Sequence, residues 1–152
     1  MKTKLYNIIL ISACILCASC SSEINNKIIQ VNYGTSFGEC IGYCKHELTL
    51  KQDSTTFHCS GWSQQYPTLT FHETLTPAAW DSAKANLNIK SFFDLQEVIG
   101  CPDCADGGAE WLEIKLANGD VHKVTFEYGN EPTLLKNHMF WYREKLSENE
   151  CK

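Results

Sequence analysis

The sequence predicts an α+β domain in which an antiparallel sheet carries two main helices on one face, supported by disulfides. Three observations predict it. Short alternating apolar segments are separated by turn residues, two longer segments have helical spacing, and six cysteines remain after an N-terminal export segment. In chain order this gives strands, a helix, a hairpin and a last helix, an order typical of helices packed on an antiparallel sheet.

Four segments in the first half of the chain are predicted strands: residues 28–33, 47–51, 55–60 and 68–73. In the first, Ile29, Val31 and Tyr33 alternate onto one face, and in the last Leu69 and Phe71 point inward. A polar turn joins the second strand to the third.

The residues chosen for that turn set the register of the two strands. With Asp53-Ser54 as the turn, Leu50 lies opposite Phe57 and Leu48 lies opposite Cys59. All four side chains then face one side, so the register is self-consistent.

A helix is predicted to begin at Thr76-Pro77, because a capping hydroxyl is followed by proline at the first helical position. It continues through Trp80, Ala83 and Leu87, which are spaced as one apolar face. A short helical turn over residues 92–95 is expected to close the core.

The clearest hairpin joins residues 111–116 to residues 121–128. A loop of Asn118-Gly119 alone would set Leu112 against a threonine. A three-residue loop that begins at Ala117 sets Leu112 against Val124 and puts Gly119 in the left-handed position, so we prefer it.

The last helix is predicted over residues 132–146, with Asn130 as its cap. Its apolar side chains recur at helical spacing and are Leu135, Met139, Tyr142 and Leu146.

The N-terminus has the pattern of a secretory signal peptide. Lys2 and Lys4 precede an apolar run over residues 5–16, which is too short to span a bilayer comfortably. Residues 16–20 resemble a bacterial lipobox, in which the final cysteine, here Cys20, receives lipid and becomes the mature N-terminus. A rival site at Cys14 would leave an apolar region of about nine residues, at the short end of the workable range.

We therefore expect a signal peptide over residues 1–19, a tether over residues 20–27 and a single domain over residues 28–152. The expected location is the bacterial cell envelope, lipid-anchored, with the outer membrane favoured. The mature chain would carry 11 basic and 18 acidic residues, a net charge of −7, with no run of five basic residues. Nucleic acid is therefore not an expected partner.

Six cysteines would remain in the mature domain: Cys40, Cys44, Cys59, Cys101, Cys104 and Cys151. An even number in an oxidising compartment favours disulfides, and the pairing stays open. A bridge between Cys44 and Cys59 fits the strand parity, although Cys40 could compete. The alternative is structural zinc, because two pairs have metal-like spacing. Redox chemistry at Cys101-Pro-Asp-Cys104 is disfavoured, since the paired glycines that follow oppose a helix.

The segment around Phe37-Gly38-Glu39-Cys40-Ile41-Gly42-Tyr43 resembles the signature of an uncharacterised family of exported bacterial domains, Phe-Gly-x-Cys-x-x-Tyr. An Asp-Gly region ahead of a hairpin, here Asp106-Gly107, belongs to the same resemblance. The similarity would cover roughly residues 29–146. It implies no activity, because none is attached to the family.

Two aromatic residues in a polar segment are the best binding candidates, although Trp62 could instead fold back as a lid on the core. Trp62 and Tyr66 lie in the polar segment 60–67, and such rings often anchor a ligand or partner. A second segment, 102–110, holds three carboxylates, but their spacing fits no EF-hand. No catalytic motif is present, so we expect a binding module for protein or glycan, with no cofactor and no metal. The alternatives are a zinc-binding module at the cysteine pairs and an envelope enzyme of unknown class.

The anchor assignment predicts that Cys20→Ser releases the protein from membranes or blocks its processing, because lipidation requires the thiol. Membrane fractionation together with lipid labelling checks this. Cys14→Ser is the matched control and should keep its lipid. Lipid retained by Cys20→Ser and lost by Cys14→Ser would show that the cleavage site is wrongly assigned.

Overall fold

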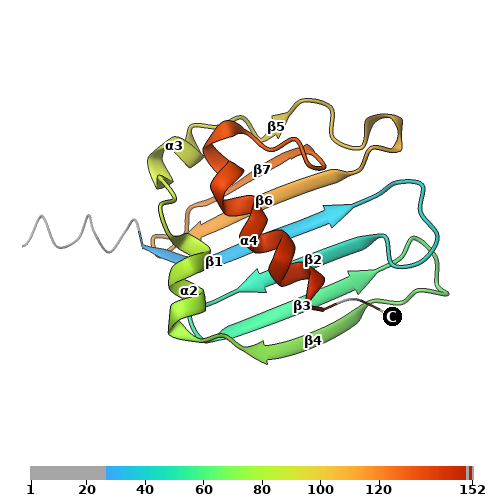
Figure 1. Ribbon diagram of the computed structural model, residues 1–152, viewed down its shortest axis with the longest axis horizontal. Helices are drawn as coiled ribbons and strands as arrows, with labels where there is room; N and C mark the ends of the chain where they lie inside the picture. Colours follow the sequence, from blue (N-terminus) through green and yellow to red (C-terminus); the bar gives the residue numbers. More distant parts are fainter. Residues whose placement is uncertain (1–26, 150, 152) are drawn as a thin grey trace, which may run out of the picture.

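The computed structural model describes residues 27–149 and 151, so the expected signal peptide, Cys20 and nearly all of the tether lie outside the described residues. Seven strands form one sheet in the order β4-β3-β2-β1-β6-β7-β5 (Figure 1). The strands are β1 (Ile28–Ser36), β2 (Lys45–Leu50), β3 (Ser54–Ser60), β4 (Leu69–Thr74), β5 (Val98–Ile99), β6 (Ala109–Leu116) and β7 (Val121–Glu127). The helices are α2 (Pro77–Lys84), α3 (Ile89–Phe93) and α4 (Lys136–Ser147).

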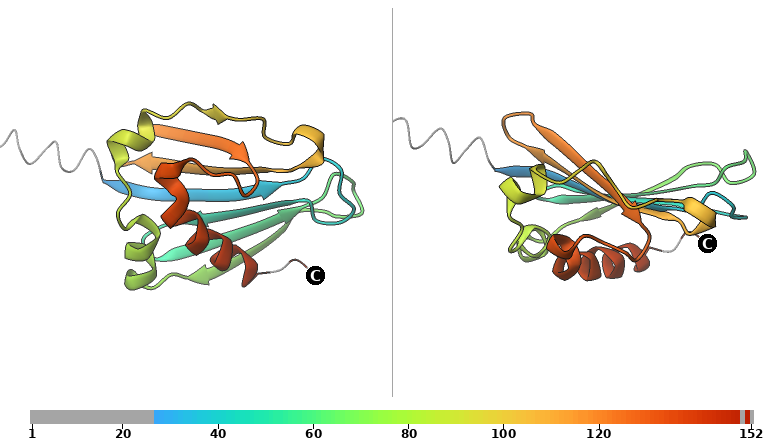
Figure 2. Two further views of the ribbon diagram at one scale, coloured as in Figure 1. Left: turned by 45° about the horizontal axis from the view of Figure 1, so that its top comes forward. Right: turned by 90° about the horizontal axis from the view of Figure 1, so that it is seen from above.

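The predicted fold class is confirmed. Every strand pair is antiparallel except the short parallel pair of β5 with β7, and β1 lies at the centre between β2 and β6. Figure 2 shows α2 and α4 on the same face of the sheet. The outer edges are β4 and the two-residue β5. Within the part of the chain that the structure describes, no helix is long and apolar enough to cross a membrane.

The core lies between the sheet and the helices. Tyr142 of α4 stacks on Tyr33 of β1 with ring centroids 5.4 Å apart, and its hydroxyl donates to the carbonyl of Ala83 in α2. These contacts join both main helices to the central strand. On the other face of the sheet, the ring of Trp111 lies against Gly34, where a Cβ atom would collide with it.

The β6–β7 hairpin confirms the three-residue loop. Leu112 faces Val124, and Gly119 has φ of +96°, the left-handed conformation that glycine adopts without steric cost.

The β2–β3 register prediction is wrong by two residues. Leu48 faces Phe57 and Leu50 faces Thr55, because the turn is closed by a 2.8 Å hydrogen bond from the Lys51 N–H to the Ser54 carbonyl. A shift of two residues keeps every side chain on its face, so the buried set is as predicted.

Two expected inward side chains are exposed. A register shift between Ile28 and Gln30 breaks the alternation of β1, so Ile28 is buried in place of Ile29. Phe71 is 44% exposed, because β4 is an edge strand that the helices do not fully cover.

Of the two predicted helix caps, Thr76 is confirmed and Asn130 is wrong. Thr76 caps α2 by accepting from the Ala79 N–H, but α2 ends at Lys84, before Leu87. Asn130 does not cap the last helix; its side chain donates to Glu127. A 3-10 turn (Thr133–Leu135) leads into α4, and neither start has a capping side chain among the described residues.

All six cysteines of the expected mature domain lie in pairs at disulfide distance. The pairs are Cys40–Cys44, Cys59–Cys151 and Cys101–Cys104. The bridge that strand parity left open between Cys44 and Cys59 is therefore not the one formed. Cys44 pairs with Cys40 in the same loop, and Cys59 pairs with Cys151, which follows α4.

The loop lengths predict unequal contributions to stability. Cys59 and Cys151 are 92 residues apart, whereas Cys101 and Cys104 are three apart. In the chain-entropy model the long loop contributes about 4–5 kcal/mol and the short loop about 2 kcal/mol. Urea unfolding of Cys151→Ser under non-reducing conditions should therefore show the larger loss.

The paired variant Cys101→Ser/Cys104→Ser is the control, since both cysteines are exposed and their replacement leaves the core intact. Equal losses of unfolding free energy in the two variants would contradict the loop-length argument.

Candidate functional site

Four loops meet at one end of the sheet. Antiparallel pairing brings together the ends of β1, β3 and β7 and the starts of β2, β4 and β6. The connecting segments 37–44, 61–68, 100–108 and 128–132 therefore share this end, at the right of Figure 1. We call it the loop end. The first described residue, Lys27, lies at the opposite end of β1.

Specific contacts hold these loops together. The indole N–H of Trp62 donates to the carbonyl of Phe37 at 2.8 Å. The Phe37 ring meets Tyr128 edge-on, with centroids 5.0 Å apart. The backbone N–H of Gly38 donates to the carboxylate of Asp103 at 3.1 Å. The loop end is thus one connected surface.

Large apolar side chains are exposed on this surface. Ile41 is 96% exposed, Trp62 is 59% exposed and Tyr128 is 46% exposed. Tyr66 is half-buried and packs edge-on against Tyr43, with centroids 5.5 Å apart. Of the two aromatic candidates from the sequence, Trp62 therefore faces solvent, and Tyr66 mainly supports the loop.

The four connecting segments of the loop end carry only acidic charge. None of its four segments contains lysine or arginine, whereas the carboxylates of Glu39, Asp103 and Asp106 are exposed. Apolar side chains with an acidic surround favour a partner that carries positive charge around an apolar patch.

The segment with the cysteine pair at 101 and 104 has an unusual backbone. Asp103, Ala105 and Asp106 all have positive φ, a conformation that non-glycine residues rarely adopt. Cys101 precedes a three-residue 3-10 turn (Cys104–Asp106) and not an α-helix, so the helix dipole that would activate a redox cysteine is not supplied.

The resemblance signature falls on the same surface, since its residues Phe37, Gly38, Cys40 and Tyr43 all lie in the first of the four loops. Phe37 also contacts Gly108, where a Cβ atom would collide with its ring.

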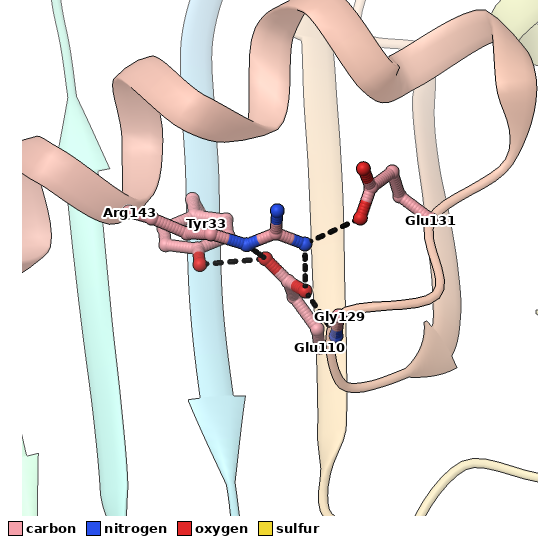
Figure 3. A network of polar contacts seen from close by, with 5 residues as sticks. All are labelled: Tyr33, Glu110, Gly129, Glu131 and Arg143. Atoms are coloured by element: carbon pink, nitrogen blue, oxygen red, sulfur yellow. Dashed lines mark hydrogen bonds and ion pairs between the residues drawn. The ribbon is translucent and has the colours of Figure 1, made fainter.

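A buried polar network lies next to the loop end, under α4 (Figure 3). The carboxylate of Glu110 is fully buried. One oxygen accepts from the Tyr33 hydroxyl at 2.7 Å and from Nε of Arg143 at 2.9 Å. The other accepts from Nη2 of Arg143 at 2.7 Å and from the Gly129 N–H at 3.1 Å. The same Nη2 reaches Glu131 at 2.5 Å.

The network shifts the pKa of its members in opposite directions. Burial, together with the Glu110 charge, raises the pKa of Tyr33 far above its usual value, so the phenol stays protonated. Burial opposes the charge on Arg143, but hydrogen bonds to the two carboxylates outweigh it and raise the Arg143 pKa. Burial would raise the pKa of Glu131, yet the bond from Arg143 lowers it overall. At neutral pH Arg143 is therefore positively charged and Glu131 is negatively charged.

A small groove of about 190 Å³ opens beside this network. Its lining combines β-sheet side chains with the C-terminal half of α4 and includes Tyr33, Thr35, His46, Phe57, Tyr128 and Arg143. Tyr128 belongs to the loop end as well, so the groove and the loop end adjoin.

Sequence reasoning missed the network. Glu110 has the same strand parity as Leu112 and Ile114, which could have placed it on the core face. Its partner Arg143 lies 33 residues further on, and no local pattern connects the two.

One group of side chains in the described part of the chain is close enough to share a metal ion. Within residues 27–149 and 151, the only group of three His, Cys, Asp or Glu side chains close enough to share an ion is His46, Cys59 and Cys151. The cysteines of the two closely spaced pairs and the carboxylates of residues 102–110 do not gather in this way among the described residues.

Comparisons with known proteins add no family. The sequence matches no protein-family model, and no curated protein matches it. The resemblance to a family of exported bacterial domains therefore stays a prediction.

The network predicts that Arg143→Met destabilises the fold by about 3 kcal/mol, because it leaves the buried Glu110 charge without its cation. The lower end of the usual range is expected, since Tyr33 and Gly129 still donate to Glu110 and about a third of Arg143 is exposed. Chemical denaturation measures the loss.

Lys145→Met is the matched control. Lys145 is also on α4, but its partners Glu148 and Glu73 are exposed, so its loss should cost less than about 1 kcal/mol. In the double variant Arg143→Met/Glu110→Gln the penalty should shrink, because the unpaired charge is gone. A penalty that stays the same would contradict the charge argument.

Proposed function

We propose that this chain is a lipid-anchored protein of the bacterial cell envelope that binds a protein partner through the loop end. The observation that carries the proposal is the gathering of exposed apolar side chains, Ile41, Trp62 and Tyr128, at the end of the sheet opposite the N-terminal entry. Exposed aromatic and aliphatic side chains on a rigid surface are typical anchors of protein interfaces.

The direction of the chain supports this arrangement. An anchor at Cys20 enters the domain through β1, whose nine residues extend about 30 Å at 3.3 Å per residue. With an anchor at Cys20, the loop end would thus lie at the end of β1 far from the membrane.

Rigidity supports it as well. The Trp62 ring is held by its hydrogen bond to Phe37, which in turn packs on Tyr128. A side chain already fixed in one orientation loses less entropy on binding.

Charge selects the class of partner. Because the four connecting segments of the loop end have carboxylates and no lysine or arginine, a protein with lysine or arginine around an apolar patch is favoured over a neutral glycan. A glycan partner is the alternative, since a fixed tryptophan ring also offers a stacking face.

Site-specific photocrosslinking in intact cells tests the proposal. A photoreactive phenylalanine at Ile41 or at Trp62 should give the same discrete protein adduct. Changing Glu39, Asp103 and Asp106 together to their amides should reduce that adduct, because the acidic surround is removed. Trp62→Ala should change the free energy of unfolding by no more than about 0.5 kcal/mol, since the side chain is exposed.

Phe140 is the matched control, because it is 72% exposed on the outer side of α4. The photoreactive residue placed there should not give the adduct. Equal adducts from all three positions, or none from Ile41 and Trp62, would reject the loop end as an interface. A heterogeneous carbohydrate adduct would decide for the glycan alternative.

A further inference from the structure

Three potential metal ligands converge beneath the C-terminal end of α4. They are His46 on β2, Cys59 on β3 and Cys151 in the segment after α4, and their ligand atoms all lie within 4.8 Å of one another. His46 and Cys59 are direct partners in the β2–β3 pairing, so the sheet fixes two of the three. Cys151 follows α4, which the Arg143–Glu110 pair joins to β6.

The surroundings suit a ligand set. Cys59 is fully buried and Cys151 is partly exposed. The His46 ring stacks on Phe57, with centroids 6.4 Å apart and planes 15° apart, which restrains its orientation.

Solvent reaches one side of the cluster. The groove beside the polar network is lined by His46 and Phe57 and opens along α4. An open approach of this kind leaves room for a further ligand, such as water.

We propose that the reduced chain binds Zn(II) through His46, Cys59 and Cys151, with the fourth coordination position open. Two thiolates and one imidazole form a ligand set that zinc accepts, and three protein ligands plus an open position are typical of non-structural zinc sites.

The disulfide and the ion exclude each other. A dithiol reductant breaks the bond between Cys59 and Cys151, supplies two electrons and two protons, and becomes a disulfide itself. Zn(II) then replaces the two thiol protons, which pass to solvent. The cluster therefore exists either as a bridge or as a metal site, according to its redox state.

Cobalt and zinc titration of the full-length protein in detergent tests this. The protein is reduced with a phosphine under anaerobic conditions and titrated with Co(II), whose thiolate charge-transfer absorption reports sulfur ligation, and Zn(II) is then added to displace it. The wild type should bind one equivalent. His46→Gln and Cys151→Ser should each weaken binding at least about tenfold, since even changes to groups around a metal ligand cost that much.

Two controls isolate the cluster. His58→Gln removes a histidine of the same sheet that is not in the cluster, and Cys101→Ser/Cys104→Ser removes two other thiols; both should bind as the wild type does. The wild type is titrated in its reduced form, so neither it nor Cys151→Ser has the Cys59–Cys151 disulfide. A difference in binding between them therefore reports the missing thiolate and not the missing bridge. Circular dichroism checks folding, and if His46→Gln unfolds, Cys151→Ser decides alone.

Unchanged binding in folded His46→Gln and Cys151→Ser would overturn the proposal. Loss of the ion only in Cys101→Ser/Cys104→Ser would overturn it as well, and so would equal binding by the oxidised protein.

Discussion

The burial of one carboxylate constrains much of this structure. Glu110 lies on the core face of β6 with no exposed surface, so it is stable as a charge only where a cation and hydrogen-bond donors reach it. Arg143 reaches it from α4 through two parallel hydrogen bonds. Those bonds join the helix to the central part of the sheet at one point. In the same helix orientation Tyr142 stacks on Tyr33 of β1.

The buried pair also extends to the surface. Glu110 accepts from the N–H of Gly129, which fixes the start of the connection between β7 and α4. The preceding residue, Tyr128, packs on Phe37, whose carbonyl holds the indole of Trp62. A continuous series of contacts thus connects an ion pair in the core with the most exposed aromatic ring of the loop end. The contacts that hold the loop end therefore extend into the core of the domain and are not confined to the loops.

Local pattern predicted what depends on local physics. The loop ending at Gly119 could be read from parity, because only a three-residue loop keeps Leu112 against an apolar partner. The β2–β3 register could not, since a shift by two residues preserves the same buried faces. Exposure of Ile29 depends on an irregularity in the pairing of β1 with β6, which no sequence period reveals. The pairing of Cys59 with Cys151 could not be predicted either, because the two residues are 92 apart and their proximity depends on where α4 packs on the sheet.

One edge of the sheet has a consequence for solubility. β4 offers a six-residue edge whose outward backbone groups have no strand partner in the described chain, and Phe71 on it is partly exposed. An edge of this kind is a template for another strand. The opposite edge is the two-residue β5, too short to serve in the same way. Repulsion between copies, from a formal net charge of −5 at pH 7, opposes such pairing. As acid neutralises the carboxylates and the net charge approaches zero, that repulsion fades, and pairing through the β4 edge becomes a route to self-association.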